Sequence, residues 1–153
     1  MHMPPLAQAI DFAGSPATTP APTLVRGPFR YFHYACDAFN DTGWGCGFRT
    51  VQTILSWLSP ENVPSIPELQ GLLGHATDGS SWIGVQDAVV ILDELADSRV
   101  KVLTLASGRD AAAHLAALEA HFDAGGGPCM IGGGTDVYSK TVVGVSRVDG
   151  AHS

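Results

Sequence analysis

Cys46 is the residue of this chain whose surroundings best suit covalent chemistry, because it lies between Gly45 and Gly47 and directly precedes a helical pattern. A thiol at the start of a helix meets unpaired backbone N–H groups and the positive end of the helix dipole. Both favour the thiolate, which is the form that attacks a carbonyl carbon. The alternative is a small buried cysteine in a glycine-rich turn, which is the commoner role of a lone cysteine.

The residues around Cys46 also resemble a known family. Gly43-Trp44-Gly45-Cys46, followed by Phe48-Arg49 and Gln52-Thr53, is similar to the active-site segment of the cysteine proteases specific for the ubiquitin-fold modifier. Further segments resemble that family in the same order, over roughly residues 29–147: Tyr31–Tyr34, Trp82–Gly84 and Met130–Gly134. The resemblance implies a papain-like fold and an activity that matures this small protein tag and removes it from conjugates.

Tyr34 is the second candidate site residue, and it lies twelve residues before Cys46. The resemblance implies that a tyrosine at this spacing supplies its hydroxyl to the oxyanion hole. The backbone N–H of Cys46, at the helix start, is a plausible further donor. The alternative for Tyr34 is a ring packed into the core with its hydroxyl at the surface, which is the commoner fate of a tyrosine.

The base of the reaction has no candidate in these residues. The family carries an Asp-Pro-His motif soon after the segment that matches Lys140–Val148, and this sequence contains no Asp-Pro-His. We assign none of its six histidines as a base, and we expect His33 to point away from Tyr34 if that segment is extended. The chain is therefore expected to be a poor or inactive peptidase.

Two alternatives to a working peptidase stay open. One is a non-catalytic relative or fragment that binds the modifier, which the missing Asp-Pro-His favours. The other is a relative of the autophagy-type cysteine proteases, which also use Gly-Trp-Gly-Cys but usually place Met and Leu before the Arg. Here Gly47-Phe48 precedes Arg49 and Gln52-Thr53 follows it, which favours the proteases of the ubiquitin-fold modifier.

Other residues of the motifs are expected to have mainly structural roles, with two alternatives open for the tryptophans. Trp44 and Trp82 either line a narrow channel for a Gly-ending tail or pack into the core. Arg49 and Gln52, on the helix that follows Cys46, are expected to hold neighbouring loops rather than to do chemistry. The glycines 132–134 fit a tight turn better than a phosphate site.

The pattern of elements predicts an α+β domain, with helices first and strands toward the C-terminus. Residues 1–28, rich in Pro, Ala and Thr, are expected to be a disordered tail, and residues 29–153 the peptidase domain. Asp149-Gly150 signals a hairpin turn just before the last residue, so we expect the C-terminal part of the sheet to be missing. The expected helices are 46–58, 66–73, 85–95 and 107–122, and the expected strands are 100–105, 129–131 and 141–148.

Composition narrows the functional classes. The chain has 153 residues and a net charge of −7 without a basic patch, so nucleic acid is not an expected partner. Its three cysteines have no regular spacing, which argues against a disulfide framework, and no metal or other cofactor is expected. No apolar run is long enough for a membrane span, and no secretory signal is visible. We expect a reduced, cytoplasmic setting, with the modifier and its conjugates as partners and the oligomeric state left open.

Overall fold

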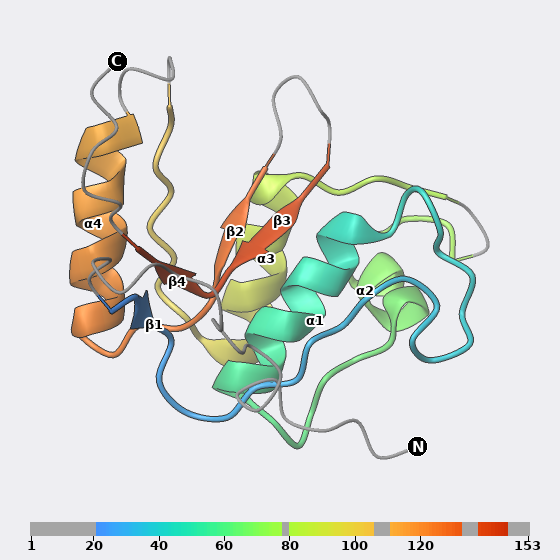
Figure 1. Cartoon of the computed structure of the whole chain (residues 1–153). Helices are drawn as coiled ribbons and strands as arrows, with labels where there is room; N and C mark the ends of the chain where they lie inside the picture. The colour runs from blue at the N-terminus through green and yellow to red at the C-terminus, as the bar shows by residue number, and fades with distance from the viewer. Residues whose placement is uncertain (1–20, 78–79, 106–110, 133–137, 147–153) are drawn as a thin grey trace.

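The computed structural model describes residues 21–77, 80–105, 111–132 and 138–146. Within these ranges the chain forms helices and short strands in an α+β arrangement (Figure 1). The helices are α1 (Cys46–Leu58), α2 (Ile66–Leu72), α3 (Val85–Ala96) and α4 (Ala111–Asp123), and the strands are β1 (Thr23–Leu24), β2 (Cys129–Ile131), β3 (Lys140–Val142) and β4 (Gly144–Val145).

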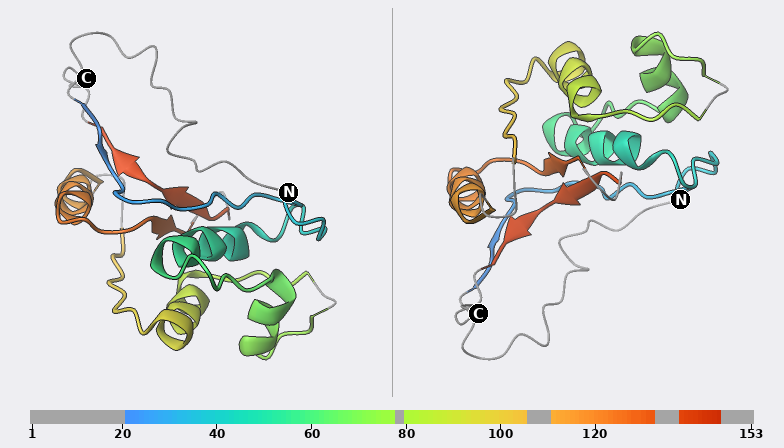
Figure 2. Two further views of the ribbon diagram at one scale, coloured as in Figure 1. Left: turned by 90° about the horizontal axis from the view of Figure 1, so that it is seen from below. Right: turned by 90° about the horizontal axis from the view of Figure 1, so that it is seen from above.

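Helix α1 is the central element of the fold. Figure 2 shows it between the strands, on one side, and α2 and α3, on the other. Ten consecutive residues of α1, from Gly47 to Ser56, are buried. A helix that is covered all round must satisfy its polar side chains internally, so the polar residues of α1 become attachment points for other segments.

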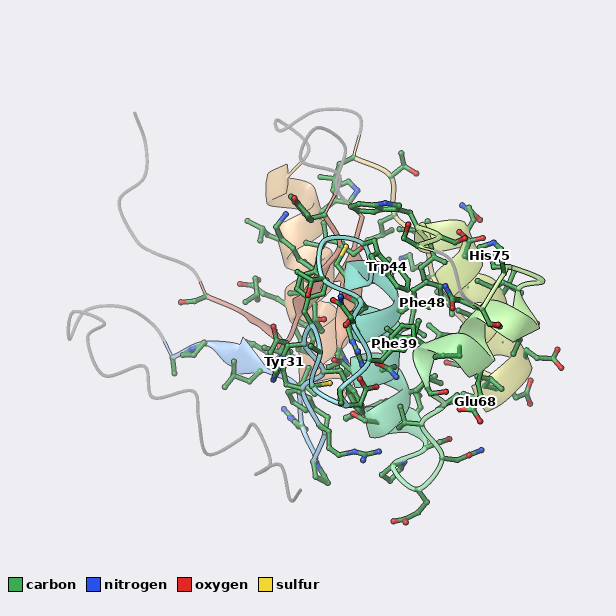
Figure 3. All side chains as sticks on the ribbon, turned by 90° about the vertical axis from the view of Figure 1, so that its right-hand side faces the viewer. Tyr31, Phe39, Trp44, Phe48, Glu68 and His75 are labelled. Carbon is green, nitrogen blue, oxygen red and sulfur yellow. The ribbon has the colours of Figure 1, made fainter. Side chains whose placement is uncertain are left out.

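The core lies between α1 and the two helices beside it. Phe48, Val51 and Leu55 of α1 meet Ile66 and Leu69 of α2, and the cluster continues into α3. Figure 3 shows the aromatic rings of Phe39, Trp44 and Phe48 gathered beside α1. The ring of Trp44 meets those of Phe39 and Phe48 edge-on, with centroids 6.0 and 6.1 Å away. Aromatic packing therefore fixes the turn that leads into Cys46.

The start of α2 confirms a local sequence signal. Ser65 and Glu68 are spaced as in a capping box, and the backbone N–H of Ser65 donates a 2.7 Å hydrogen bond to the Glu68 carboxylate. The predicted ends of α1, α2 and α3 agree with the structure to within one residue. Helix α4 is also present, but its predicted cap, Ser107, lies outside the described residues.

The strands form two antiparallel pairs. In the first pair β2 runs beside β3, with Met130 opposite Thr141. In the second pair β1 runs beside β4, with Thr23 opposite Val145, and α4 packs on this pair. The prediction of one strand over 141–148 was wrong, because the run divides at Val143 and each part pairs with a different partner. Residues 147–153, including the predicted Asp149-Gly150 turn, lie outside the described residues.

The expected disordered tail over residues 1–28 includes residues that the structure shows to be ordered. Residues 1–20 lie outside the described residues, but Thr23–Leu24 is a strand and the Val25 N–H donates to the Val143 carbonyl at 2.9 Å. The Trp57 indole N–H also donates to the Arg26 carbonyl at 2.7 Å. A strand of two residues leaves no periodic pattern in the sequence, so composition alone placed this segment in the tail.

The predicted strand over 100–105 was also wrong. These residues form no strand, and Val100, Val102, Leu103 and Leu105 are all exposed. Their β-branched and apolar side chains are typical of a half-buried β-strand, which is why a strand was predicted. A strand also needs a neighbour for its backbone hydrogen bonds, and no strand of the described residues pairs with this segment.

Gly47 and Gly71 form a matched pair for testing how tightly α1 is packed. A Cβ on Gly47 would lie 2.6 Å from Ile83 Cγ1 and 2.9 Å from the Ile83 carbonyl oxygen, whereas a Cβ on Gly71 of α2 would meet nothing within 4 Å. Gly47→Ala is expected to lower the free energy of unfolding by about 1–3 kcal/mol through overpacking. Gly71→Ala is expected to raise it by roughly 0.5–1 kcal/mol, because alanine is the better helix former. Urea denaturation measures both, and equal effects of the two changes would contradict this packing.

Candidate active site

Cys46 is the first residue of α1, as the sequence predicts. Its side chain is half-buried and lies in the wall of a groove of about 590 Å³. The Cys46 sulfur accepts a hydrogen bond from the backbone N–H of Ser139, with a donor-to-sulfur distance of 3.4 Å. The thiol therefore faces backbone donors and the positive end of a thirteen-residue helix, both of which stabilise negative charge on sulfur.

The glycine before Cys46 is required by close packing. Gly45 is the N-cap residue of α1, and a Cβ at this position would lie 2.6 and 2.7 Å from Cβ and Cγ of Asp41. Any side chain at residue 45 would displace the Asp41 carboxylate. The glycine-rich motif thus lets a buried acid approach the backbone next to the thiol.

Tyr34 lines the same groove as Cys46, near enough for the Cys46 side chain to influence the pKa of its hydroxyl. Burial raises the pKa of Tyr34 to about 12, and the Cys46 side chain acts in the same direction. The hydroxyl consequently keeps its proton at neutral pH and is a hydrogen-bond donor. The structure brings the two predicted site residues together, while their catalytic roles stay predictions.

Three segments far apart in the sequence build the groove. They are the stretch around Tyr34, the start of α1 and the residues that lead into β3. The Thr141 hydroxyl of β3 lies 3.3 Å from the Thr50 hydroxyl of α1, which ties two of the walls together. The lining residues are Tyr31, Phe32, His33, Tyr34, Thr42, Gly43, Cys46, Arg49, Thr50, Tyr138, Ser139, Lys140 and Thr141.

His33 is placed differently from the expectation. It was expected to point away from Tyr34, but both residues line the groove. The irregular path of residues 31–34 removes the strict alternation of an extended strand. His33 Nδ1 lies 2.9 Å from the Tyr34 carbonyl oxygen, which can only accept, so Nδ1 carries a hydrogen in this contact.

The other described histidines lie on elements away from Cys46. His75 follows α2, and His114 and His121 belong to α4. His121 Nε2 lies 2.8 Å from the Gly127 carbonyl oxygen, where it holds the turn between α4 and β2. Among the described residues, His33 is therefore the histidine that the groove includes.

Trp44 and Trp82, each expected either to pack into the core or to line a channel, differ in their surroundings. Trp44 is partly buried and packs against the core cluster, so it has the structural role. Trp82 is exposed, and its ring centroid lies 6.2 Å from that of Tyr138, which lines the groove. Trp82 is thus placed to extend the aromatic wall of the groove. Of the glycines at 132–134, only Gly132 is among the described residues.

An ion-pair cluster, formed by Arg49, Asp37 and Asp41, adjoins the groove through Arg49, and Asp37 is its exposed member. Arg49 Nε and Nη2 each donate a 2.8 Å hydrogen bond to the Asp41 carboxylate, and Nη1 and Nη2 donate to Asp37 at 2.9 and 2.8 Å. Arg49 is 3% exposed and Asp41 is fully buried. We call these three residues the Arg49 cluster. The sequence analysis expected Arg49 to hold loops but did not identify its partners.

The pKa values of the Arg49 cluster follow from mutual neutralisation. Burial acts to lower the pKa of Arg49, but hydrogen bonds to Asp41 and Asp37 outweigh it, so the pKa lies above its ordinary value. Burial likewise acts to raise the pKa of Asp41, and the Arg49 hydrogen bonds reverse this and lower it. For Asp37 the hydrogen bond from Arg49 is the largest cause of a lowered pKa.

Polar side chains further along α1 hold the segment that precedes Tyr34. The Phe32 N–H donates to Thr53 Oγ1 at 3.1 Å, and the Arg30 N–H donates to Ser56 Oγ at 2.8 Å. Gln52 holds a second segment, because its Nε2 donates to the Pro64 carbonyl at 2.8 Å. The expected loop-holding role of Gln52 is confirmed by this contact.

The three cysteines are free thiols in different surroundings. Cys129 lies in β2, where burial raises the pKa of its thiol. Cys36 lies 3.4 Å from Arg49 Nη1, in the segment ahead of α1. Of the three, Cys46 alone begins a helix.

The described parts of the chain contain neither a cluster of metal ligands nor a helix that could span a membrane. Within those residues, no three or more His, Cys, Asp or Glu side chains gather as metal ligands would. The helices found there are too short or too polar to cross a bilayer.

A thiol at a helix start, a neighbouring tyrosine and an adjoining groove, carried on an α+β scaffold, are the features of a papain-like fold. The model of Peptidase family C78 matches residues 21–152, and the chain belongs to this family.

Known proteins agree with this placement. Over 137 residues the chain is 37% identical to Ufm1-specific protease 1 of Mus musculus, and over 135 residues it is 38% identical to the probable Ufm1-specific protease 1 of Drosophila melanogaster. The crystal structure of UfSP from C. elegans superposes with a TM-score of 0.71 at 33% identity, over 81% of this chain and 24% of that one.

The matches cover unequal shares of the two proteins compared. They take in 84% and 80% of this chain for the mouse and fly proteins, respectively. The chain spans 63% of the length of the mouse relative and 57% of the length of the fly relative.

Acid is expected to destabilise the fold through the Arg49 cluster. The pKa values of Asp37 and Asp41 are depressed from an ordinary 3.8. The stability that these carboxylates contribute is therefore complete above that ordinary value and is lost as the pH falls through the depressed values. Urea unfolding from about pH 6 to about pH 2 measures this loss.

Two variants test the source of the acid sensitivity. Asp37→Asn is expected to flatten the acid limb, because it removes one of the depressed carboxylates. Glu68→Gln is the control, since the pKa of Glu68 is also lowered, by hydrogen bonds from Ser65, but Glu68 lies outside the Arg49 cluster. An acid limb that responds equally to both changes would show that the cluster is not its source.

Proposed function

We propose that this chain is a thiol peptidase domain that acts on Ufm1, the ubiquitin-fold modifier, to mature it and to release it from conjugates. The observation that carries the proposal is that Tyr34 and Cys46, the first residue of α1, line one groove, with the Ser139 N–H donating to the Cys46 sulfur. Membership of Peptidase family C78 and the names of the mouse and fly relatives support the choice of substrate.

The proposed reaction is acyl transfer through Cys46. The thiolate forms a bond to the carbonyl carbon at the end of the modifier, and the carbonyl oxygen takes the negative charge. Tyr34 donates its hydroxyl hydrogen bond to that oxygen, and the backbone at the helix start adds further donors. The C–N bond then breaks, the amine leaves with a proton, and water hydrolyses the thioester to free Cys46.

We assign none of these 153 residues as the general base that the proton-transfer step needs. The family resemblance implies that the histidine of an Asp-Pro-His motif takes the thiol proton and returns it to the leaving amine. That motif is absent from the sequence. The proposal therefore includes slow turnover by the chain as it stands, since loss of triad members is costly in acyl-transfer enzymes.

A second candidate function is binding of Ufm1 without cleavage. The groove that contains Cys46 and Tyr34 supports it, because a groove can hold the tail of the modifier without a base that completes the catalytic site. We also propose a reduced, cytoplasmic setting for either function, which agrees with three cysteines that are free thiols.

Cleavage of a Ufm1 precursor distinguishes the two functions. The 153-residue chain is compared with a version extended through an Asp-Pro-His strand, and turnover is followed by gel or mass spectrometry. We expect the extended version to be faster by roughly 10⁴-fold or more, and Cys46→Ala to abolish cleavage in both.

Ufm1 binding is measured on the same proteins by calorimetry. Binding by both forms with cleavage by neither would establish the non-catalytic function. Comparable cleavage by both forms, lost on Cys46→Ala, would show that a residue of the present chain is the base and would overturn the expected impairment. Absence of both binding and cleavage would refute Ufm1 as the substrate.

A further inference from the structure

The segment that carries Tyr34 is strained at the very next residue. Ala35 has a φ of +54° and Ala38 a φ of +67°, both in the left-handed region that favours glycine. Residues that carry a Cβ are strained in this region, so the conformation persists only where other contacts impose it. The position of Tyr34 therefore depends on what holds Ala35.

Asp41 is the residue that holds Ala35. Its Oδ1 accepts a 2.8 Å hydrogen bond from the Ala35 N–H. Its backbone carbonyl oxygen accepts a 2.9 Å hydrogen bond from the Gly45 N–H. One fully buried residue is thus bonded to the neighbour of Tyr34 on one side and to the neighbour of Cys46 on the other.

Arg49 fixes Asp41 in turn from within α1. The guanidinium contacts both carboxylate oxygens of Asp41 with two 2.8 Å hydrogen bonds, a geometry that leaves the carboxylate little freedom to rotate. Arg49 lies one turn after Cys46 in the same helix. The thiol, the guanidinium and the Asp41 carboxylate are therefore parts of one rigid frame.

We propose that Asp41 is a positioning residue, which sets the Tyr34 hydroxyl against the Cys46 sulfur by bridging Ala35 to Gly45. The inference rests on the proposed oxyanion role of Tyr34 and extends it, because it assigns that geometry to a residue that does not touch the reacting atoms. Asp37, which also contacts Arg49, has no hydrogen bond to Ala35 or Gly45 among the contacts of the described chain. It is the matched control.

Two reactions of Cys46 distinguish the positioning of the Tyr34 hydroxyl from the reactivity of the thiol itself. Acetylation by p-nitrophenyl acetate passes through an oxyanion: the thiolate bonds to the acetyl carbon, the C–O bond breaks, and p-nitrophenolate leaves as the anion, while the proton of the thiol has gone to buffer. Alkylation by iodoacetamide displaces iodide and forms no oxyanion. The ratio of the two rates at Cys46, read by mass spectrometry, reports oxyanion stabilisation and uses no Ufm1.

Tyr34→Phe is expected to lower this ratio by roughly 10²-fold, the scale of losing one oxyanion donor. Asp41→Asn is expected to lower it by a similar factor, while the alkylation rate changes little. In the Tyr34→Phe background, Asp41→Asn should then have no further effect, because both changes remove the same contact. Asp37→Asn is expected to lower stability and leave the ratio near that of the unaltered chain.

Three results would overturn the proposal. They are an unchanged ratio in Asp41→Asn, an equal loss in Asp37→Asn, or a loss in the Tyr34→Phe background as large as in the unaltered chain. If Asp41→Asn alone does not fold, the double variant Ala35→Gly/Asp41→Asn is compared with Ala35→Gly, because glycine removes the strain at φ +54° and stabilises the loop. The ratio is expected to fall in the double variant, and an unchanged ratio would overturn the proposal. Because the assay contains no modifier, its failure is independent of whether the chain cleaves Ufm1.

Discussion

The buried guanidinium of Arg49 governs how the chain is arranged around the groove. A positive charge inside a protein is tolerated only where carboxylates and hydrogen bonds neutralise it, and removal of one partner of such a group is strongly destabilising. Both of its carboxylates, from Asp37 and Asp41, come from the irregular segment ahead of α1. Neutralising the charge therefore folds that segment back over the start of the helix, which is where Tyr34 is needed.

Other polar side chains of helix α1 also hold neighbouring segments in place. A covered helix would ordinarily present only apolar side chains, yet α1 buries Gln52, Thr53 and Ser56. Thr53 and Ser56 are hydrogen bonded to the backbone of the segment that precedes Tyr34, and Gln52 is hydrogen bonded to the backbone at Pro64. The helix thus positions irregular chain by hydrogen bonding, whereas α2 and α3 are held to it by apolar contact.

Sequence reasoning was reliable where the signal is local. Apolar periodicity and the Ser65–Glu68 cap are complete within a few residues, so α1, α2 and α3 were predicted closely, and Cys46 with them. The proximity of Tyr34 came from a family resemblance rather than from its physical chemistry.

Reasoning from sequence failed where the structure of a segment depends on a partner that is distant in the sequence. The run at 100–105 has strand character without a strand beside it, and β1 exists only because β4 supplies its hydrogen bonds. The Ser139 N–H on the Cys46 sulfur was also missed, since a backbone donor leaves no trace in residue type. An arginine one turn into a buried helix was the one signal that could have revealed the Arg49 cluster, since it requires acidic partners, and Asp37 and Asp41 are the acids just upstream.

The pairing of β1 with β4 has a consequence for synthesis on the ribosome. Thr23 emerges early, but its partner Val145 is made only after all four helices, and closure of so long a loop is entropically slow. The wall of the groove that contains Ser139 belongs to the same late segment. While the chain is being made, the helical half can collapse around α1 with Cys46 still uncovered on one side. The thiol site therefore forms only after β3 and β4 have been made, and a nascent chain carries the nucleophile before it carries the cleft.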